Sequence, residues 1–170
     1  DDIPVLMRLL DEADADPAVR VLVLTGSGRA FSAGYHLGDL AEQTEGGGSD
    51  AGVPSFEALT VRLERCRVPT ICRLNGGVYG GSTDLALACD FRIGRDDIEM
   101  FMPAARLGVH YYEVGMRRYV SRLGLNAAKR LFLTAERIGA AMLLSLIDDS
   151  VKLHGSASEQ PRPEAERKFG

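Results

Sequence analysis

The sequence has 170 residues, of which 45% are hydrophobic and 26% charged, and its formal net charge is −4. This length and composition favour one globular domain, and the negative charge argues against a partner that is nucleic acid or a membrane surface. No apolar run approaches the roughly 20 residues of a membrane span. Cys66, Cys72 and Cys89 have no metal-ligand spacing, so we expect no metal site and predict buried thiols in a reducing, cytoplasmic compartment.

The first third of the chain alternates between helical and strand-like patterns. Apolar residues recur at helical spacing over residues 3–13, which predicts an amphipathic helix. The nearly all-aliphatic run 19–25 predicts a buried strand. Residues 42–54 are polar and glycine-rich and predict a mobile loop. Helical spacing returns over residues 56–66 and ends before Val68-Pro69, because a residue that precedes proline is disfavoured in a helix.

A glycine-rich turn stands in the middle of the chain, between a strand-like run at residues 70–74 and a helix-forming run at residues 82–89. Glycine permits positive φ and the close approach of a backbone or ligand. The first turn of a helix has unpaired N–H groups and the positive end of the helix dipole. This order of elements suits the binding of an anionic oxygen, although a tight turn without a ligand fits the same residues.

The last part of the chain predicts short strands and then helices. Residues 91–94 and 99–102 read as two strands that form a hairpin or lie as neighbours. Residues 103–112 are expected to be irregular, and helices are predicted at 114–123, 126–133 and 139–146. Strands that alternate with helices make the fold class α/β. The segment 155–170 is charged, contains two prolines and is expected to be frayed or disordered.

Three long segments carry a specific pattern. They are VRVLVLTGSGRAFSAGYHLGDL (19–40), VPTICRLNGGVYGGSTDLALACDFRIG (68–94) and the run 100–151, which includes MPAARLG and RLGLNAAKRLFLTAERI. In this order and spacing they resemble the crotonase, or enoyl-CoA hydratase/isomerase, superfamily. The resemblance implies a crotonase-like acyl-CoA-binding domain at residues 1–151, followed by a polar, flexible tail at 152–170.

The resemblance also implies an architecture and partners. The fold would be a spiral of β-β-α turns with a C-terminal helical region that packs a homotrimer or a dimer of trimers. The ligand would be an acyl-CoA thioester, bound as substrate with no further cofactor. Family members carry further strands before the first helix and further helices after LIDDSV, so we expect this chain to be truncated at both ends.

In this family two backbone N–H groups form an oxyanion hole for the thioester oxygen. By position, they belong to Tyr35 and to Gly81, and the flanking Ala33, Gly34 and Gly80 would contact the substrate. Preorganised donors of this kind contribute about 3–4 kcal/mol each to catalysis in a dry site. The alternative is that both segments are loop turns without a ligand.

The turn Gly26-Ser27-Gly28 lacks the third glycine of a dinucleotide-binding motif, because Phe31 stands at that place. The resemblance instead brings this loop to the CoA nucleotide and makes Arg29 a candidate partner of a phosphate. A solvated surface arginine is the alternative.

The two glutamates of the family's hydratases fall at Asp84 and Ala104. Alanine cannot transfer a proton, so hydration by two carboxylates is not expected here. Asp84 could act alone, as single carboxylates do in family isomerases. The alternative is a carboxylate that only favours the helix dipole.

The segment LGVHYYEVG (107–115) resembles the corresponding segment of methylmalonyl-CoA decarboxylases, in which Tyr111 would orient a substrate carboxylate. His36 titrates near neutrality when unperturbed and is a candidate acid or base, or else a loop histidine with no such role. Glu113 is the nearest spare carboxylate and is expected to border the acyl pocket.

Three functions therefore compete. The first is an enoyl-CoA hydratase/isomerase-like enzyme that uses Asp84 as the acid or base. The second is a decarboxylase-like lyase that uses Tyr111 and His36. The third is a truncated, non-catalytic protein that binds CoA or assembles with relatives.

Overall fold

The computed structural model describes residues 2–34, 55–146 and 150–152. Its helices are α1 (Asp2–Ala15), α3 (Phe56–Glu64), α4 (Ser82–Ala88), α5 (Ala104–Leu107), α6 (Glu113–Leu123), α7 (Leu125–Lys129), the π-helix η1 (Arg130–Thr134) and α8 (Ala140–Leu146). Its strands are β1 (Leu22–Thr25), β2 (Thr70–Leu74), β3 (Val78–Tyr79), β4 (Phe91–Gly94), β5 (Glu99–Phe101), β6 (Arg137–Gly139) and β7 (Ser150–Lys152). The predicted loop at 42–54 and tail at 155–170 lie outside the described residues, as do Tyr35 and His36.

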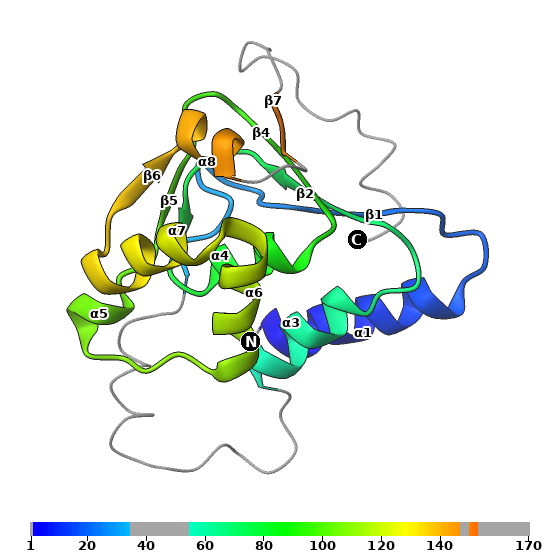
Figure 1. Cartoon of the computed structure of the whole chain (residues 1–170). Helices are drawn as coiled ribbons and strands as arrows, with labels where there is room; N and C mark the ends of the chain where they lie inside the picture. The colour runs from blue at the N-terminus through cyan, green and yellow to red at the C-terminus, as the bar shows by residue number, and fades with distance from the viewer. Residues whose placement is uncertain (1, 35–54, 147–149, 153–170) are drawn as a thin grey trace.

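The strands form two sheets, and the chain passes back and forth between them (Figure 1). One sheet has four parallel strands in the order β1-β2-β4-β7, and the other has the order β3-β5-β6. After β2 in the first sheet come β3 in the second and then α4, and after β4 in the first sheet come β5 in the second and further helices. This repeat is the predicted spiral of β-β-α turns and confirms the α/β fold class.

The expectation that residues 91–94 and 99–102 form a hairpin or lie as neighbouring strands is wrong, because β4 and β5 belong to different sheets. β4 pairs with β2 and β7, whereas β5 pairs with β3 and β6. Residues 103–112 are also not wholly irregular, because they contain the short helix α5. The helices predicted at 3–13, 56–66, 82–89 and 114–123 are confirmed.

The strand predicted at 19–25 is present as β1, but it is not buried. Val21 is 45% exposed and Val23 is 52% exposed. Within the described residues β1 pairs only with β2, so it is the terminal strand of the parallel sheet. The residues Val23, Ile71 and Phe91 follow one another across β1, β2 and β4, and the two at the ends of this row are exposed.

The centre of the molecule is α4, a helix that is buried over nearly its whole length. It packs against α3 and α6, which lie beside it in Figure 1. None of the helices in the described ranges has the length and apolar character that a membrane crossing requires.

The buried guanidinium of Arg92 closes the C-terminal end of α4. Its Nη1 donates to the carbonyl oxygens of Cys89 at 2.7 Å and Ala86 at 3.3 Å, and its Nη2 donates to that of Asp90 at 3.0 Å. The last carbonyls of a helix have no partner within the helix, and a cation there also favours the dipole. Arg92 therefore satisfies these groups where water cannot reach them.

Replacing this guanidinium by an apolar side chain should destabilise the fold. We expect Arg92→Met to lower the free energy of unfolding by about 2–3 kcal/mol, because buried carbonyls lose charge-assisted hydrogen bonds. Urea unfolding followed by circular dichroism measures this change. Arg95→Met is the matched control, since Arg95 is exposed and forms a surface ion pair with nearby Asp97, and it should leave the midpoint unchanged. Equal midpoints for the two variants would contradict the capping role.

Candidate functional site

The segment before Tyr35 lies directly along the glycine turn. The N–H of Phe31 donates to the carbonyl of Gly77 at 3.0 Å, and the N–H of Tyr79 donates to the carbonyl of Ser32 at 3.1 Å. Ser32 also forms an isolated parallel bridge with Val78. These hydrogen bonds hold the FSAG segment, residues 31–34, beside the glycine turn that precedes α4.

Gly34 and Gly80 meet where the two segments come closest. Both adopt positive φ, at 84° and 59°. A Cβ on Gly34 would lie 2.5 Å from the carbonyl oxygen of Tyr79, so no larger residue fits there without a shift of the backbone. A Cβ on Gly80 would lie 3.8 Å from the Cα of Gly34. The structure therefore brings Gly34 and Gly80, two of the predicted substrate-contacting residues, together, with exposed Ala33 beside them.

Gly81 caps the N-terminal end of α4. Among the described residues none accepts a hydrogen bond from its backbone N–H. The ring of Phe56, the first residue of α3, covers Gly81, because a Cβ built there would be 3.3 Å from the ring. Gly81 thus combines an unused donor, a helix N-terminus and an apolar cover.

Asn75 holds the preceding loop in place, a role that the sequence reasoning missed. Its Oδ1 accepts from the N–H of Gly26 at 2.9 Å, and its Nδ2 donates to the carbonyls of Gly28 at 2.8 Å and Ala30 at 3.2 Å. The side chain of Arg29, in the same loop, is exposed. An asparagine directly before a glycine pair was the available signal, since its amide both donates and accepts.

Asp84 lies one turn into α4 and is fully buried. Its Oδ1 accepts from Nη1 of Arg118 at 2.6 Å. Its Oδ2 accepts from the hydroxyl of Tyr111 at 3.1 Å and from that of Tyr112 in a short hydrogen bond. Asp84 is therefore a fully partnered carboxylate, and the tyrosine hydroxyls cover it.

Arg118 links this carboxylate to α3. Its side chain is 1% exposed, and its Nη2 donates to Glu64 at 3.0 Å, whose side chain is 39% exposed. Burial lowers the pKa of the Arg118 guanidinium, but hydrogen bonds to Glu64 and Asp84 outweigh it and raise the pKa overall. The positive charge is thus retained, and it compensates the carboxylate behind the tyrosines.

Aromatic rings pack around the same carboxylate. The rings of Tyr111 and Tyr112 stack with centroids 4.5 Å apart. The ring of Tyr111 also packs against those of Tyr119 and Phe132, with centroid distances of 6.0 Å and 5.3 Å. The rings pack this closely against α6 only because residue 115 is glycine. A Cβ at Gly115 would lie 2.4 Å from the ring of Tyr111. Burial, followed by the neighbouring Tyr119 and Asp84, raises the pKa of Tyr111. Burial, followed by the charge of Asp84, raises that of Tyr112.

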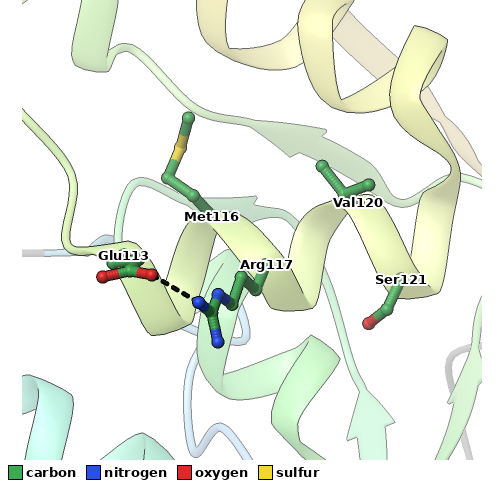
Figure 2. Close-up of a pocket in the computed structure, with 5 residues that line it drawn as sticks. All are labelled: Glu113, Met116, Arg117, Val120 and Ser121. Atoms are coloured by element: carbon green, nitrogen blue, oxygen red, sulfur yellow. Dashed lines mark ion pairs between the residues drawn. The ribbon is translucent and has the colours of Figure 1, made fainter.

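Two other positions singled out in the sequence lie away from Asp84 or bring no titratable group to it. Ala104 is buried at the start of α5 and offers no titratable group. Glu113 does not join Asp84, because its side chain is exposed and pairs with Arg117 at 2.6 Å. Both side chains line a groove of about 360 Å³ along α6. Figure 2 shows them joined as an ion pair. The lining residues are Glu113, Met116, Arg117, Val120 and Ser121.

No group of three or more His, Cys, Asp or Glu side chains that could hold a metal ion occurs in the described ranges. The polar groups of the site are instead an open backbone N–H, a buried carboxylate and phenol hydroxyls. A spiral of β-β-α turns around a buried helix, with a second chain segment laid along its glycine turn, defines an α/β protein of the crotonase class.

The chain belongs to the enoyl-CoA hydratase/isomerase family, whose model matches residues 5–146. A probable enoyl-CoA hydratase of Mycobacterium bovis is 34% identical over 130 residues, which cover 76% of this chain and 49% of the relative. A carnitinyl-CoA dehydratase of Proteus mirabilis is 36% identical over 137 residues, which cover 80% of this chain and 50% of the relative.

The solved structures agree with the fold. A crystal structure of an enoyl-CoA hydratase/isomerase family member superposes with a TM-score of 0.77 at 27% identity, covering 88% of this chain and 59% of that one. This chain spans about half the length of the two curated relatives named above.

Because Asp84 and Arg118 form a buried ion pair, we expect removal of one charge to cost more free energy of unfolding than removal of both. Arg118→Met should lower the free energy of unfolding by about 3–5 kcal/mol, because Asp84 is left buried without its counter-charge. The double variant Asp84→Asn/Arg118→Met should lose less than Arg118→Met alone. Arg117→Met is the control on the same helix, because Arg117 is 77% exposed, and it should have little effect. Urea unfolding measures all three, and a double variant that loses as much free energy of unfolding as Arg118→Met alone, or more, would contradict the pairing.

The tyrosines predict a loss of stability in alkali. Their pKa in the folded chain lies above the ordinary value of 10.0, so the folded state holds these protons more tightly than the unfolded state does. The stability is therefore fully present below pH 10 and decreases as the pH rises further. Urea unfolding between about pH 9 and about pH 11 should show this slope. Tyr112→Phe should reduce the slope, and an unchanged slope would count against a perturbed Tyr112.

Proposed function

We propose that this chain forms the substrate-binding and catalytic part of an enzyme that acts on an acyl-CoA thioester. The N–H groups of Tyr35 and Gly81 hold the thioester oxygen and stabilise the enolate that develops there. The contact between Gly34 and Gly80 carries this proposal, because Gly34 immediately precedes Tyr35 and Gly80 immediately precedes Gly81. Membership of the enoyl-CoA hydratase/isomerase family supports it.

The chemistry at the oxygen follows from the groups available. Deprotonation next to a thioester moves negative charge onto its oxygen. Two preorganised N–H donors and the N-terminal end of α4 favour that charge without reorganisation during the reaction. The donors bind the enolate more strongly than the neutral thioester, which is the condition for faster turnover.

Asp84 supplies the proton acceptor of this mechanism, acting through its tyrosines. The carboxylate is buried behind the hydroxyls of Tyr111 and Tyr112, which both donate to Oδ2. A phenol oxygen takes the proton from the substrate as its own proton passes to Asp84. The reverse transfer returns the proton to the γ-carbon of the conjugated enolate, two carbons from the α-carbon that lost it, and the double bond moves into conjugation with the thioester. The position of the second carboxylate of the family's hydratases is occupied here by Ala104, which cannot transfer a proton. This mechanism therefore favours migration of a double bond over hydration by two carboxylates.

A decarboxylase-like reaction is the second candidate, in which the hydroxyl of Tyr111 orients a substrate carboxylate. The bond that this hydroxyl donates to Asp84 at 3.1 Å supports it by fixing the position of the phenol. Asp84 argues against it, since a substrate carboxylate held beside Tyr111 would lie close to a second negative charge. Release of CO₂ from malonyl-CoA or methylmalonyl-CoA would establish this candidate in place of the first. A chain that binds acyl-CoA in calorimetric titration and turns over neither kind of substrate would be the non-catalytic third candidate.

Substitution of the carboxylate tests the proposal directly. We expect Asp84→Asn to lower kcat for isomerisation of vinylacetyl-CoA to crotonyl-CoA by at least about 10²-fold, since the amide cannot accept the proton. The control is Asp97→Asn, an exposed carboxylate paired with Arg95, which should keep native activity. The Asp84 variant is compared only if its circular dichroism spectrum matches the native one. Unchanged turnover in that variant would remove Asp84 from the mechanism.

A further inference from the structure

We infer that Phe56, Tyr112 and Tyr111 form an aromatic wall that restricts this site to thioesters of short acyl groups. The inference rests on the proposed function, because it takes Gly81 as one of the two groups that hold the thioester oxygen. It adds the class of acyl group, which neither the family nor the fold determines.

The wall begins at the oxyanion donor itself. The ring of Phe56 lies so close to Gly81 that an added Cβ would be 3.3 Å from one ring carbon and 3.4 Å from another. Phe56 meets Tyr112 edge to face, with centroids 6.4 Å apart and planes at 72°. Tyr112 then stacks on Tyr111 at 4.5 Å. The three rings thus run without interruption from Gly81 to the hydroxyls that cover Asp84.

An acyl group bound here must lie against these rings. With its thioester oxygen at Gly81, its reacting carbon has to reach a tyrosine hydroxyl for the proton to pass to Asp84. Gly81 and Asp84 are one helical turn apart, since the N–H of Asp84 donates to the carbonyl of Gly81 at 2.9 Å. The acyl chain beyond the reacting carbon is therefore directed at the wall.

Hydrogen bonds hold the two tyrosines of the wall in place. Both hydroxyls donate to Asp84, and that of Tyr112 also lies 3.0 Å from the hydroxyl of buried Thr60. Asp84 is in turn paired with buried Arg118. A ring that swung aside would break a hydrogen bond to an ionised, desolvated acceptor, which is among the stronger kinds in proteins.

The region behind the wall also does not suit a hydrocarbon tail. Asp84 is 0% exposed and the Arg118 side chain is 1% exposed, so a tail that reached them would displace the partners of a buried ion pair. Apolar groups gain nothing from such contacts, and separating the two charges is costly. A short acyl group ends before the rings and avoids this cost.

The test compares crotonyl-CoA with 2-decenoyl-CoA, and vinylacetyl-CoA with 3-decenoyl-CoA, on the full chain. Calorimetric titration gives Kd for the first pair, and isomerisation of the second pair gives kcat/KM. We expect the native chain to prefer the short member of each pair by at least about tenfold. Phe56→Ala should reduce this preference by about tenfold by admitting the longer chain, since Phe56 is the member of the wall without a hydroxyl that donates to Asp84. Phe91→Ala is the control, because Phe91 is an exposed phenylalanine of the parallel sheet, and it should keep the native preference.

The outcomes separate the two proposals. Equal affinity and kcat/KM for short and long chains in the native protein would overturn the wall and leave the proposed function intact. A native preference that Phe56→Ala does not change, in a variant with the native circular dichroism spectrum, would also overturn it. If Phe56→Ala does not fold, Phe56→Leu is measured in the same way and should give a partial gain for the longer chain. Failure of the native chain to bind or convert any of these thioesters would refute the proposed function and the wall together.

Discussion

The ion pair between Asp84 and Arg118 is the interaction on which the rest of the site depends. It joins three helices, because Asp84 belongs to α4, Arg118 to α6, and Glu64, the second partner of Arg118, to α3. Two charges buried at this depth are a weak source of stability, since desolvation offsets most of their attraction. The pair instead contributes to the geometry of the site, because the carboxylate and the guanidinium form hydrogen bonds only with groups at defined positions. The pair fixes where the helices around the centre of the molecule can lie.

The orientation of the aromatic residues follows from this pair. Tyr111 and Tyr112 direct their hydroxyls at the carboxylate, and Gly115 leaves space for their rings on α6. Phe56 then occupies the remaining space between Tyr112 and Gly81. A single carboxylate thus controls both the polar and the apolar side of the site, so a change at Asp84 affects packing as well as chemistry.

Much of this arrangement could be predicted from local patterns. The helical spacing before and after the glycine turn, and the turn itself, are properties of neighbouring residues, and they predict α3, α4 and the approach of backbone at Gly80. Strands β3, β6 and β7 could not be predicted in this way, because two or three residues carry no periodicity and become strands only through pairing with distant segments.

The partner of Asp84 was missed for a similar reason. Arg118 is 34 residues away and looks like an ordinary charged residue of a helix. Glu113 was expected to border the acyl pocket, but its side chain is exposed and pairs with Arg117.

Strand β1 influences how the described part of this chain can behave in solution. Among the described residues one backbone edge of β1 has no strand partner, and Val23 of β1 and Val21 just before it are exposed. Edges of this kind recruit strands from other molecules unless a charge, a proline or a further segment blocks them. Where no further segment covers this edge, association through β1 competes with the native fold, and it increases with protein concentration.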